Sequence, residues 1–427
     1  MSEIIKNNKK TVNAWALFDW ANSAYALVIS TAIFPIYFIE YTPDTITFGN
    51  YTFTNSSLYS FAVSFSYVLI ALLSPLLSGM ADYGGRRKFF LKLFTLIGSL
   101  SCIALYFFKG EPQLWLGTSA FVLASMGFAG GIVFYNSYLP LIVTEDRYDR
   151  VSAKGFAMGY IGSVILLIFI LVMILRPAWF GITDPQLPAR IGFILVGVWW
   201  LGFAQITFKY LPKDYRILSE ESLIKKGYQE IKSVFKKLNH QPEIKKFLYA
   251  FFFYSAGVQT VIYLATVFAD KVLNFESTEM IIIVLLLQLV AIGGAYLFAY
   301  ISKLFGNKKS LIIMVIIWIG ICFGAHYCYS KDLFYGLAAL VGLVMGGIQS
   351  ISRSTYSKML ENKEEDVTSY FSFYDVLYKG SIVVGTLAFG IVDNLTGNMR
   401  YSVLALALFF VAGLLILTRV KLKTKGA

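Results

Sequence analysis

Long apolar runs recur along the whole chain and dominate its pattern of hydrophobic and polar positions. Windows of 20 or more residues without Asp, Glu, Lys or Arg are found at 58–80, 113–144, 155–175, 247–269, 280–302, 310–330 and 333–352. A helix of about 20 apolar residues crosses the ~30 Å hydrocarbon core of a bilayer. Each window therefore predicts a transmembrane helix.

Five further stretches extend this pattern. Two are shorter uncharged runs, 191–208 and 401–418. Three carry charge: 12–39 holds Asp19, 89–108 holds Lys92, and 367–392 holds Asp375 and Lys379. The alternating polar and apolar pattern of a membrane β-barrel is absent from the sequence. The sequence therefore predicts an all-α membrane protein with twelve transmembrane helices.

Composition supports lipid as the main solvent of this chain. Hydrophobic residues make up 57% of the 427 positions and charged residues only 15%, whereas a soluble domain is about 25% charged. The net charge of +12 does not indicate nucleic-acid binding, because the basic residues lie in short loops between apolar runs. The three cysteines lie within apolar runs and there are only two histidines, so neither a metal site nor a cofactor is expected.

Lysine and arginine are unevenly distributed between the two sides of the predicted spans. If the N-terminus is cytoplasmic, only six of the 37 fall in outer loops, and Lys379 lies within a span. The other thirty lie at cytoplasmic ends and loops, which is a strong positive-inside signal. The first apolar stretch is too long for a signal peptide. We therefore expect a multi-pass protein of the cell (inner) membrane with both termini in the cytoplasm.

The longest loop, 209–246, separates the sixth span from the seventh. Its apolar residues recur at helical spacing and lysines accompany them: Ile224, Tyr228, Ile231, Phe235 and Leu238, with Lys225, Lys226, Lys232, Lys236 and Lys237. This pattern predicts an amphipathic helix. The helix could lie on the inner leaflet of the membrane or form a solvated linker, and both readings stay open at this point.

A short motif follows the second predicted span. The loop reads Asp82-Tyr83-Gly84-Gly85-Arg86-Arg87-Lys88. Glycine permits a tight turn between two helices, and the arginines are expected to remain in the cytoplasm. The loop resembles the signature of the major facilitator superfamily, in which it helps to set the balance between inward-facing and outward-facing states. The resemblance implies a gating role for Asp82, Gly85, Arg86 and Arg87.

A related loop follows the eighth span, as a repeat of six helices predicts. It reads Lys303-Leu304-Phe305-Gly306-Asn307-Lys308-Lys309, so Gly306 and Lys308 align with Gly85 and Arg87. Lys303 stands where the first loop has its acid. The interaction made by that acid is therefore in doubt here.

The first span carries a more specific signal. It contains the run WALFDWANSAY over 15–25, in which Asp19, Asn22 and Ser23 share one face of a helix. With segments 152–162 and 346–354, this run is similar to the vacuole-effluxer-like branch of the superfamily. That branch includes fungal proteins that export amino acids from the vacuole. The resemblance covers nearly the whole chain.

The resemblance implies the major facilitator fold, with two pseudo-symmetric six-helix bundles at 1–208 and 247–427 joined by the basic linker 209–246. In this superfamily spans one, four, seven and ten line a central cavity. Polar residues recur in all four spans here, and two further charges lie in span eleven. The candidate substrate- or ion-binding residues are Asp19, Asn22, Ser23, Asn136, Gln259, Gln349, Arg353, Asp375 and Lys379.

Each candidate also has a plainer explanation. A buried polar side chain often bonds a neighbouring helix instead of a ligand. Asp375 and Lys379 are four residues apart and could simply neutralise each other. Glycines in the fifth and eighth spans, Gly159, Gly162, Gly293 and Gly294, permit close helix packing.

These observations favour a secondary active transporter and not an enzyme. The expected partners are a small-molecule substrate, a coupling ion, which we expect to be the proton, and the lipid bilayer, with no nucleic acid. A substrate with both charges, such as an amino acid, would suit Asp19 and Lys379. The sequence lacks a phosphate-binding loop for ATP. A membrane-embedded enzyme acting on lipid-linked substrates and a transporter-like sensor are the alternatives.

Overall fold

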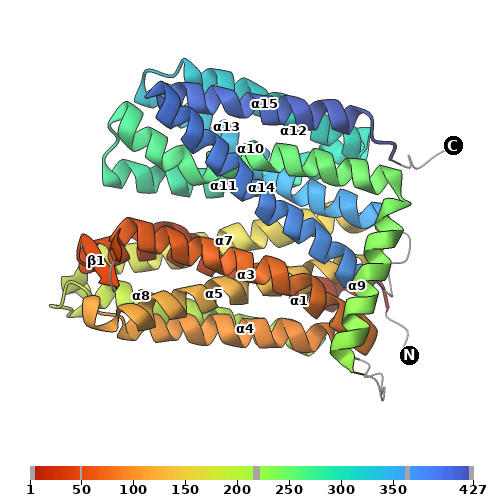
Figure 1. Ribbon diagram of the computed structural model, residues 1–427, viewed down its shortest axis with the longest axis horizontal. Helices are drawn as coiled ribbons and strands as arrows, with labels where there is room; N and C mark the ends of the chain where they lie inside the picture. The colour runs from red at the N-terminus through yellow and green to blue at the C-terminus, as the bar shows by residue number, and fades with distance from the viewer. Residues whose placement is uncertain (1–4, 49–50, 215–221, 361–365, 423–427) are drawn as a thin grey trace. The chain divides into compact units, whose positions relative to one another are not determined.

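The computed structural model describes residues 5–48, 51–214, 222–360 and 366–422. Twelve of its helical stretches are long and apolar enough to cross a membrane, which confirms the predicted number. They are visible as the long ribbons of Figure 1. The first stretch, Lys9–Tyr41, is composite: it runs through α1 (Lys9–Ala24), the π-helix η1 (Tyr25–Ile33) and α2 (Phe34–Tyr41).

The other long helices follow in chain order, and short helical turns lie between some of them. The long helices are α3 (Asn55–Gly84), α4 (Arg87–Ala104), α5 (Leu114–Ser137), α7 (Tyr148–Leu175), α8 (Leu187–Tyr210), α9 (Leu223–Asn239), α10 (Pro242–Leu273), α11 (Ser277–Phe305), α12 (Asn307–His326), α13 (Lys331–Met359), α14 (Val367–Thr396) and α15 (Met399–Thr418). The short ones are η2 (Leu105–Phe107), η3 (Glu111–Gln113), α6 (Leu139–Ile142), η4 (Glu145–Arg147) and η5 (Pro177–Phe180).

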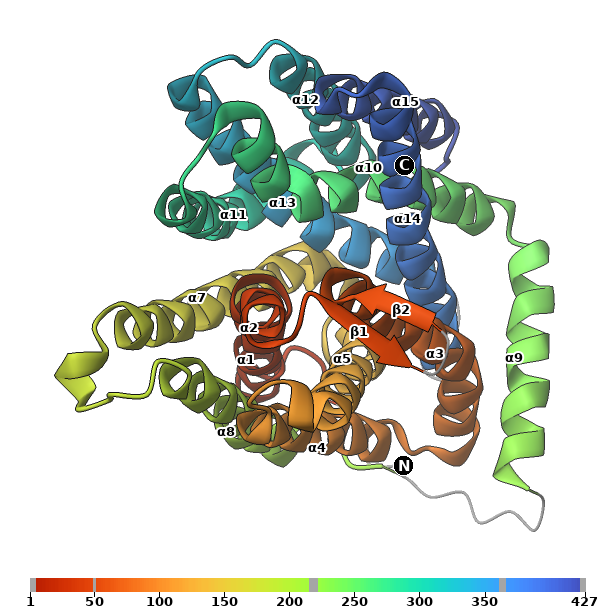
Figure 2. The ribbon, with the colours of Figure 1, turned by 60° about the vertical axis from the view of Figure 1, so that its left-hand side comes forward.

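A small β-hairpin connects the first two spans, and the sequence analysis did not predict it. Strands β1 (Thr45–Phe48) and β2 (Tyr51–Thr54) pair antiparallel, with Thr45 opposite Thr54 and Ile46 opposite Phe53. Figure 2 shows the two strands side by side. Both strands are built from threonine, isoleucine and aromatic residues, the types that favour extended backbone. The signal was present but short.

Contacts group the chain into two compact units. Unit 1 comprises Met1–Tyr138 and Met158–Tyr228, and unit 2 comprises Leu139–Ala157 and Gln229–Ala427. The first turns of α7, which begin the fifth span, therefore belong to unit 2, whereas the rest of α7 belongs to unit 1. The predicted division at 208 and 246 stays a prediction, and residues 215–221 of the predicted linker lie outside the described residues.

The helix pairs in the two units repeat with an offset of six spans. In unit 1, α4 packs on α5 and α8, α1 packs on α8, and α3 packs on α5. The corresponding pairs in unit 2 are α12 on α13 and α15, α10 on α15, and α11 on α13. This correspondence is the pseudo-symmetry expected of parallel repeats.

Glycine allows one equivalent close contact between helices in each unit. A Cβ added to Gly159 of α7 would lie 2.6 Å from the Ser23 side chain of α1, and one added to Gly385 of α14 would lie 2.4 Å from the Ala256 carbonyl of α10. Contact distances below 3.0 Å are not tolerated without movement. The two glycines therefore allow equivalent close contacts of the fifth span with the first and of the eleventh with the seventh.

Candidate functional site

In unit 1, Asp19 is buried on α1 and accepts a hydrogen bond from a tyrosine. The Tyr135 hydroxyl of α5 donates to Oδ2 of Asp19 at 2.7 Å, and only 4% of Asp19 is exposed. Tyr135 is itself held in place, because its ring stacks on Trp15 with centroids 4.5 Å apart. The Trp15 indole N–H also donates to the Tyr135 carbonyl at 3.0 Å. Asp19 therefore has a fixed, neutral hydrogen-bond donor.

Asn22 lies one turn further along α1 and is in an unusual state. Its side chain is fully buried, with 0% exposed. Neither Nδ2 nor Oδ1 has a hydrogen-bond partner among the described residues. An unmade hydrogen bond on a buried polar group costs about 1–3 kcal/mol, and native structures rarely contain such groups. The amide is therefore available to a bound ligand or water.

The helix changes its geometry next to Asn22. The π-helix η1 begins at Tyr25, and π-helical segments occur frequently at functional sites. The Tyr25 hydroxyl lies 2.6 Å from Oγ of Ser125 on α5. Asp19 and Tyr25 both reach α5, and Asn22 falls between them on α1. These two contacts bring polar side chains of the first and fourth spans together in unit 1. The sequence analysis did not predict the π-helix.

Unit 2 contains the second candidate group. Asp375 and Lys379 of α14 are both buried, with 6% and 5% exposed, and the Lys379 ammonium group donates to Oδ2 of Asp375. The pairing that the sequence suggested is therefore formed. Phe251 of α10 stacks on Tyr374 next to this pair, with ring centroids 4.1 Å apart. In this apolar environment Asp375 and Lys379 neutralise each other. Lys379 would therefore have to release Asp375 before it could bind a substrate.

The remaining polar candidates are spread over several helices. Asn136 on α5 and Gln259 on α10 are buried, whereas Ser23 on α1 and Gln349 on α13 are half-buried. Ser23 faces Gly159 of α7, so part of its surroundings is a helix contact. The assignment of these four residues to a binding site stays a prediction.

Arg353 on α13 is committed to the beginning of α7. Its Nε donates to Oγ of Ser152 at 2.9 Å and its Nη2 to the Ser152 carbonyl at 2.8 Å. Its guanidinium also lies over the Phe156 ring, 4.3 Å from the centroid. Arg353 is 3% exposed. These contacts describe a residue that joins two helices of unit 2.

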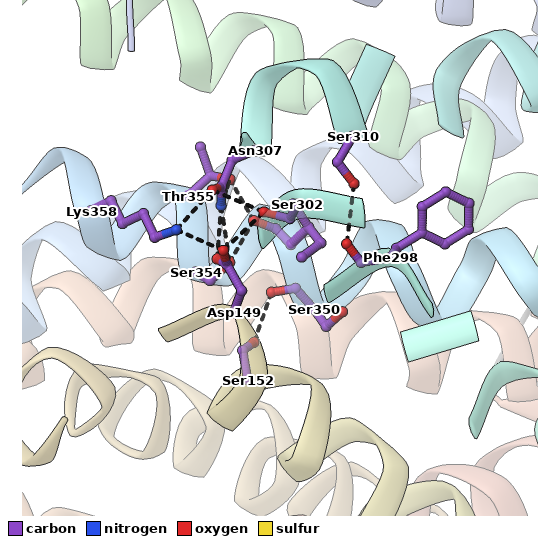
Figure 3. A network of polar contacts seen from close by, with 11 residues as sticks. Asp149, Ser152, Phe298, Ser302, Asn307, Ser310, Ser350, Ser354, Thr355 and Lys358 are labelled. Carbon is purple, nitrogen blue, oxygen red and sulfur yellow. Dashed lines mark hydrogen bonds and ion pairs between the residues drawn. The ribbon is translucent and has the colours of Figure 1, made fainter. Parts of the chain in front are cut away.

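One turn before Ser152, Asp149 is the centre of a polar network that sequence reasoning missed. Its carboxylate accepts from the Ser302 hydroxyl at 2.8 Å, from Nδ2 of Asn307 at 2.8 Å and from the Lys358 ammonium group at 2.7 Å. Figure 3 shows these side chains converging on Asp149. Asn307 also donates to Oγ1 of Thr355 at 3.0 Å. Asp149 thus links α7, the α11–α12 loop and α13.

This network resolves the question raised by the second loop motif. That loop has Lys303 in place of an acid, but Asp149 brings a carboxylate to the loop from α7. Each loop is therefore in contact with a buried acid. In the first loop the acid is Asp82 of the loop itself, and in the second it is Asp149 of α7. Only a comparison of residues far apart in the chain could have shown this, because Asp149 and Asn307 are separated by 158 positions.

The first loop motif forms a tight turn that buries Arg87. Gly85 ends α3 with a left-handed backbone, φ 59°, as the turn requires. Arg87 is buried, with 7% exposed, and its Nε donates to Oδ1 of Asp82 at 2.9 Å. Pairing with the nearby acid allows the guanidinium to be buried. The gating role of Asp82, Gly85, Arg86 and Arg87 stays a prediction.

Asp214 supports the same turn from the other side. Its carboxylate accepts from the backbone N–H groups of Lys88 and Phe89, each at 2.8 Å, at the first turn of α4. This is a favourable place for an anion, since the first N–H groups of a helix lack partners. Burial nevertheless raises the pKa of Asp214 above its ordinary value.

Among the described residues, no group of three or more His, Cys, Asp or Glu side chains is placed to hold a metal ion.

Comparison with known proteins places these features in a family. Residues 7–426 match the family model described as "Vacuole effluxer Atg22 like". The chain is 30% identical over 422 residues to a protein of Bacillus subtilis (strain 168) described as "Uncharacterized MFS-type transporter YxiO", covering 99% of this chain and 97% of that one. It is 25% identical to autophagy-related protein 22 of Pichia angusta, covering 92% and 78% of the two chains.

Solved structures show the same fold at low identity. The transporter FucP in its outward conformation matches with a TM-score of 0.71 and 13% identity, over 97% of this chain and 98% of that one. The proton:xylose symporter XylE matches with a TM-score of 0.72 and 13% identity, over 96% and 95% of the two chains. These proteins are transporters and not enzymes. The chain therefore belongs to the vacuole effluxer Atg22-like family, and it is a multi-pass secondary transporter of the major facilitator superfamily.

Proposed function

We propose that this transporter moves an amino acid or a similar zwitterion in exchange with, or together with, protons. The observation that carries the proposal is the fully buried and unpartnered amide of Asn22, one turn from the carboxylate of Asp19. Together they offer an amide donor, an amide acceptor and an acid on one helix. A substrate with an ammonium and a carboxylate group could use all three.

Asp19 is the proposed site of the amine or of the coupling proton. A carboxylic acid inside a membrane is costly and is typically placed where it binds or transfers charge. The Tyr135 hydroxyl donates to Asp19 and holds the carboxylate in place. In this proposal an ammonium group or a proton neutralises Asp19 during the transport cycle.

The substrate carboxylate has two possible partners in this proposal. The Asn22 amide can donate to it directly. Lys379 can do so only after leaving Asp375, to which it is paired. Arg353 is a poorer candidate, because Ser152 already accepts two of its hydrogen bonds. We therefore propose Asn22 as the partner of the substrate carboxylate in unit 1. In unit 2, Lys379 becomes available only when Asp375 is neutralised.

Transport by purified protein in proteoliposomes tests the proposal. Uptake of amino acids is measured with and without an imposed pH gradient, for the native chain and for Asp19→Asn, Tyr135→Phe and Asn22→Leu. We expect Asp19→Asn to abolish the dependence on the gradient, Asn22→Leu to abolish uptake and Tyr135→Phe to reduce it. Ser402→Ala on α15 is the matched control, since its hydroxyl is another buried group without a partner among the described residues.

The results separate the parts of the proposal. If Asp19→Asn retains both uptake and its pH dependence, Asp19 is not the coupling site. If amino acids of every class fail while another solute is transported, the substrate class is wrong. If Ser402→Ala reduces uptake as much as Asn22→Leu, the loss at Asn22 reflects folding and not binding.

A further inference from the structure

Helix α9 has one face that is packed against the protein and one that is not. Gly227, Val234 and Leu238 are buried. A Cβ on Gly227 would lie 2.6 Å from the Met80 side chain of α3, so the beginning of α9 is closely packed in unit 1. In unit 2 the Lys237 ammonium group donates to Asp366, immediately before α14. The helix is therefore held at both ends.

Next to the packed face lies a row of exposed apolar side chains. Ile224, Tyr228 and Phe235 have 60%, 66% and 56% of their surface exposed. Phe235 has one aromatic neighbour, Phe373, with centroids 6.0 Å apart. At 3.6 residues per turn these three side chains fall on one side of the helix. An exposed apolar row of this kind on a solvated linker would be unfavourable, whereas it is expected of a helix at a membrane surface.

Lysines border this apolar row on the side away from the protein. Lys225, Lys232 and Lys236 are exposed. At 3.6 residues per turn they lie together on one side of the helix, next to the apolar row and opposite the packed face. Tyrosine and phenylalanine favour the depth of the lipid headgroups, and lysine ammonium groups attract their phosphates. The exposed face thus has the charge and the apolar surface that an anionic leaflet complements.

The chain also places α9 at the height of the membrane surface. Only His240 and Gln241 separate the end of α9 at Asn239 from the first residue of α10, Pro242. Helix α10 belongs to a membrane span. The end of α9 is therefore within two residues of a transmembrane helix and cannot be far from the headgroups.

We propose that α9 lies in the interface of the membrane and binds anionic lipid headgroups through Lys225, Lys232 and Lys236, with Ile224, Tyr228 and Phe235 inserted among them. The proposal is independent of the transported substrate. It predicts that the contact of α9 with the bilayer depends on the fraction of anionic lipid.

Site-specific fluorescence on the full chain tests the proposal. An environment-sensitive label is attached at Tyr228→Cys, on the apolar row, or at Ser233→Cys, an exposed position roughly 140° away around the helix. The native cysteines are buried, so the native chain controls for background labelling. Each protein is reconstituted in phosphatidylcholine vesicles with or without phosphatidylglycerol, and quenching by brominated lipid is measured.

We expect the label at 228 to be quenched and the label at 233 to be much less affected. Phosphatidylglycerol should strengthen quenching at 228. Replacing Lys225, Lys232 and Lys236 with Gln should weaken the affinity of α9 for the anionic surface by about fivefold for each lysine, so quenching at 228 should fall at a given phosphatidylglycerol fraction.

A matched variant replaces Lys6, Lys9 and Lys10 with Gln. Lys6 precedes the first span, and Lys9 and Lys10 begin it. All three lie six crossings from α9 and therefore on the same side of the membrane, and replacing them removes the same charge. They should leave quenching at 228 unchanged. Equal quenching at 228 and 233, or no quenching at 228, would overturn the proposal. So would quenching at 228 that is insensitive to phosphatidylglycerol and to the three α9 lysines.

Discussion

Replacing Asp149 with alanine should destabilise unit 2 strongly for a single polar substitution. The carboxylate accepts three hydrogen bonds, one of them from Lys358. Removing one partner of a buried ion pair costs about 3–5 kcal/mol. The side chains of Lys358 and Asp149 are 24% and 11% exposed, which reduces the cost. Lys358 also donates to Oδ1 of Asn307 at 2.7 Å, so one partner remains. We expect a loss of about 3 kcal/mol.

Thermal unfolding of the purified protein in detergent measures this loss. For a cooperative unit of about 150–250 residues, 1 kcal/mol shifts Tm by roughly 2–4 °C, so Asp149→Ala should lower Tm by about 6–12 °C. Asp149→Asn keeps a neutral acceptor and should cost less. A double-mutant cycle of Asp149→Asn with Lys358→Met should give a coupling energy of about 1–2 kcal/mol, because the two groups are in direct contact.

A surface pair provides the matched control for Lys358. Lys246 and Glu243 are 2.8 Å apart, with side chains 43% and 30% exposed, and such pairs contribute about 0–1 kcal/mol. Lys246→Met should therefore lower Tm much less than Lys358→Met. If the two lysine variants behave alike, or if the cycle shows no coupling, burial of the Asp149 network does not stabilise unit 2 in the way argued here.

Three further predictions use other features of the two units. Asn22→Leu should leave thermal stability unchanged or raise it by about 1 kcal/mol, because it removes a buried amide without partners, while it abolishes uptake; a clear fall in Tm would contradict this. Gly294→Ala should prevent folding or lower Tm sharply, since its Cβ would lie 1.9 Å from a carbonyl of α13, whereas Gly293→Ala, with nothing within 4 Å, should be tolerated. The hydrogen bond to Asp366 raises the pKa of Lys237 above its ordinary value of 10.5. The pair therefore stabilises the fold fully below about pH 10.5, and this stabilisation is lost as the pH rises through the folded-state pKa of Lys237. The Tm difference between the native chain and Asp366→Asn should be constant from neutral pH to about pH 9 and shrink above about pH 10.5.

The fold could be predicted from the sequence because lipid imposes a simple requirement on it. Each span needs about 20 apolar residues, and the twelve windows of the sequence satisfy it or carry only one or two charges. The turn at Gly85 and the pair formed by Asp375 and Lys379 were also predictable, because each depends on residues within a few positions of one another. Such local arrangements require no knowledge of how the helices pack.

The candidate site was harder to predict, because its state depends on neighbours from distant helices. The spacing of Asp19 and Asn22 placed them on one face, but only packing shows that Tyr135 serves Asp19 and that Asn22 is left without a partner. The adjacent glycines 293 and 294 are equivalent in sequence, yet only Gly294 faces α13.

The origin of Asp149 has a consequence for how this transporter could be divided or recombined. A fragment that starts at 247 would contain Ser302, Asn307 and Lys358 but not the carboxylate that they surround. A chimera made by joining halves of two relatives would break the same contacts unless residues 139–157 travelled with the C-terminal half. Halves separated between α8 and α10 can therefore complete this network only by associating, because Asp149 remains with the first half.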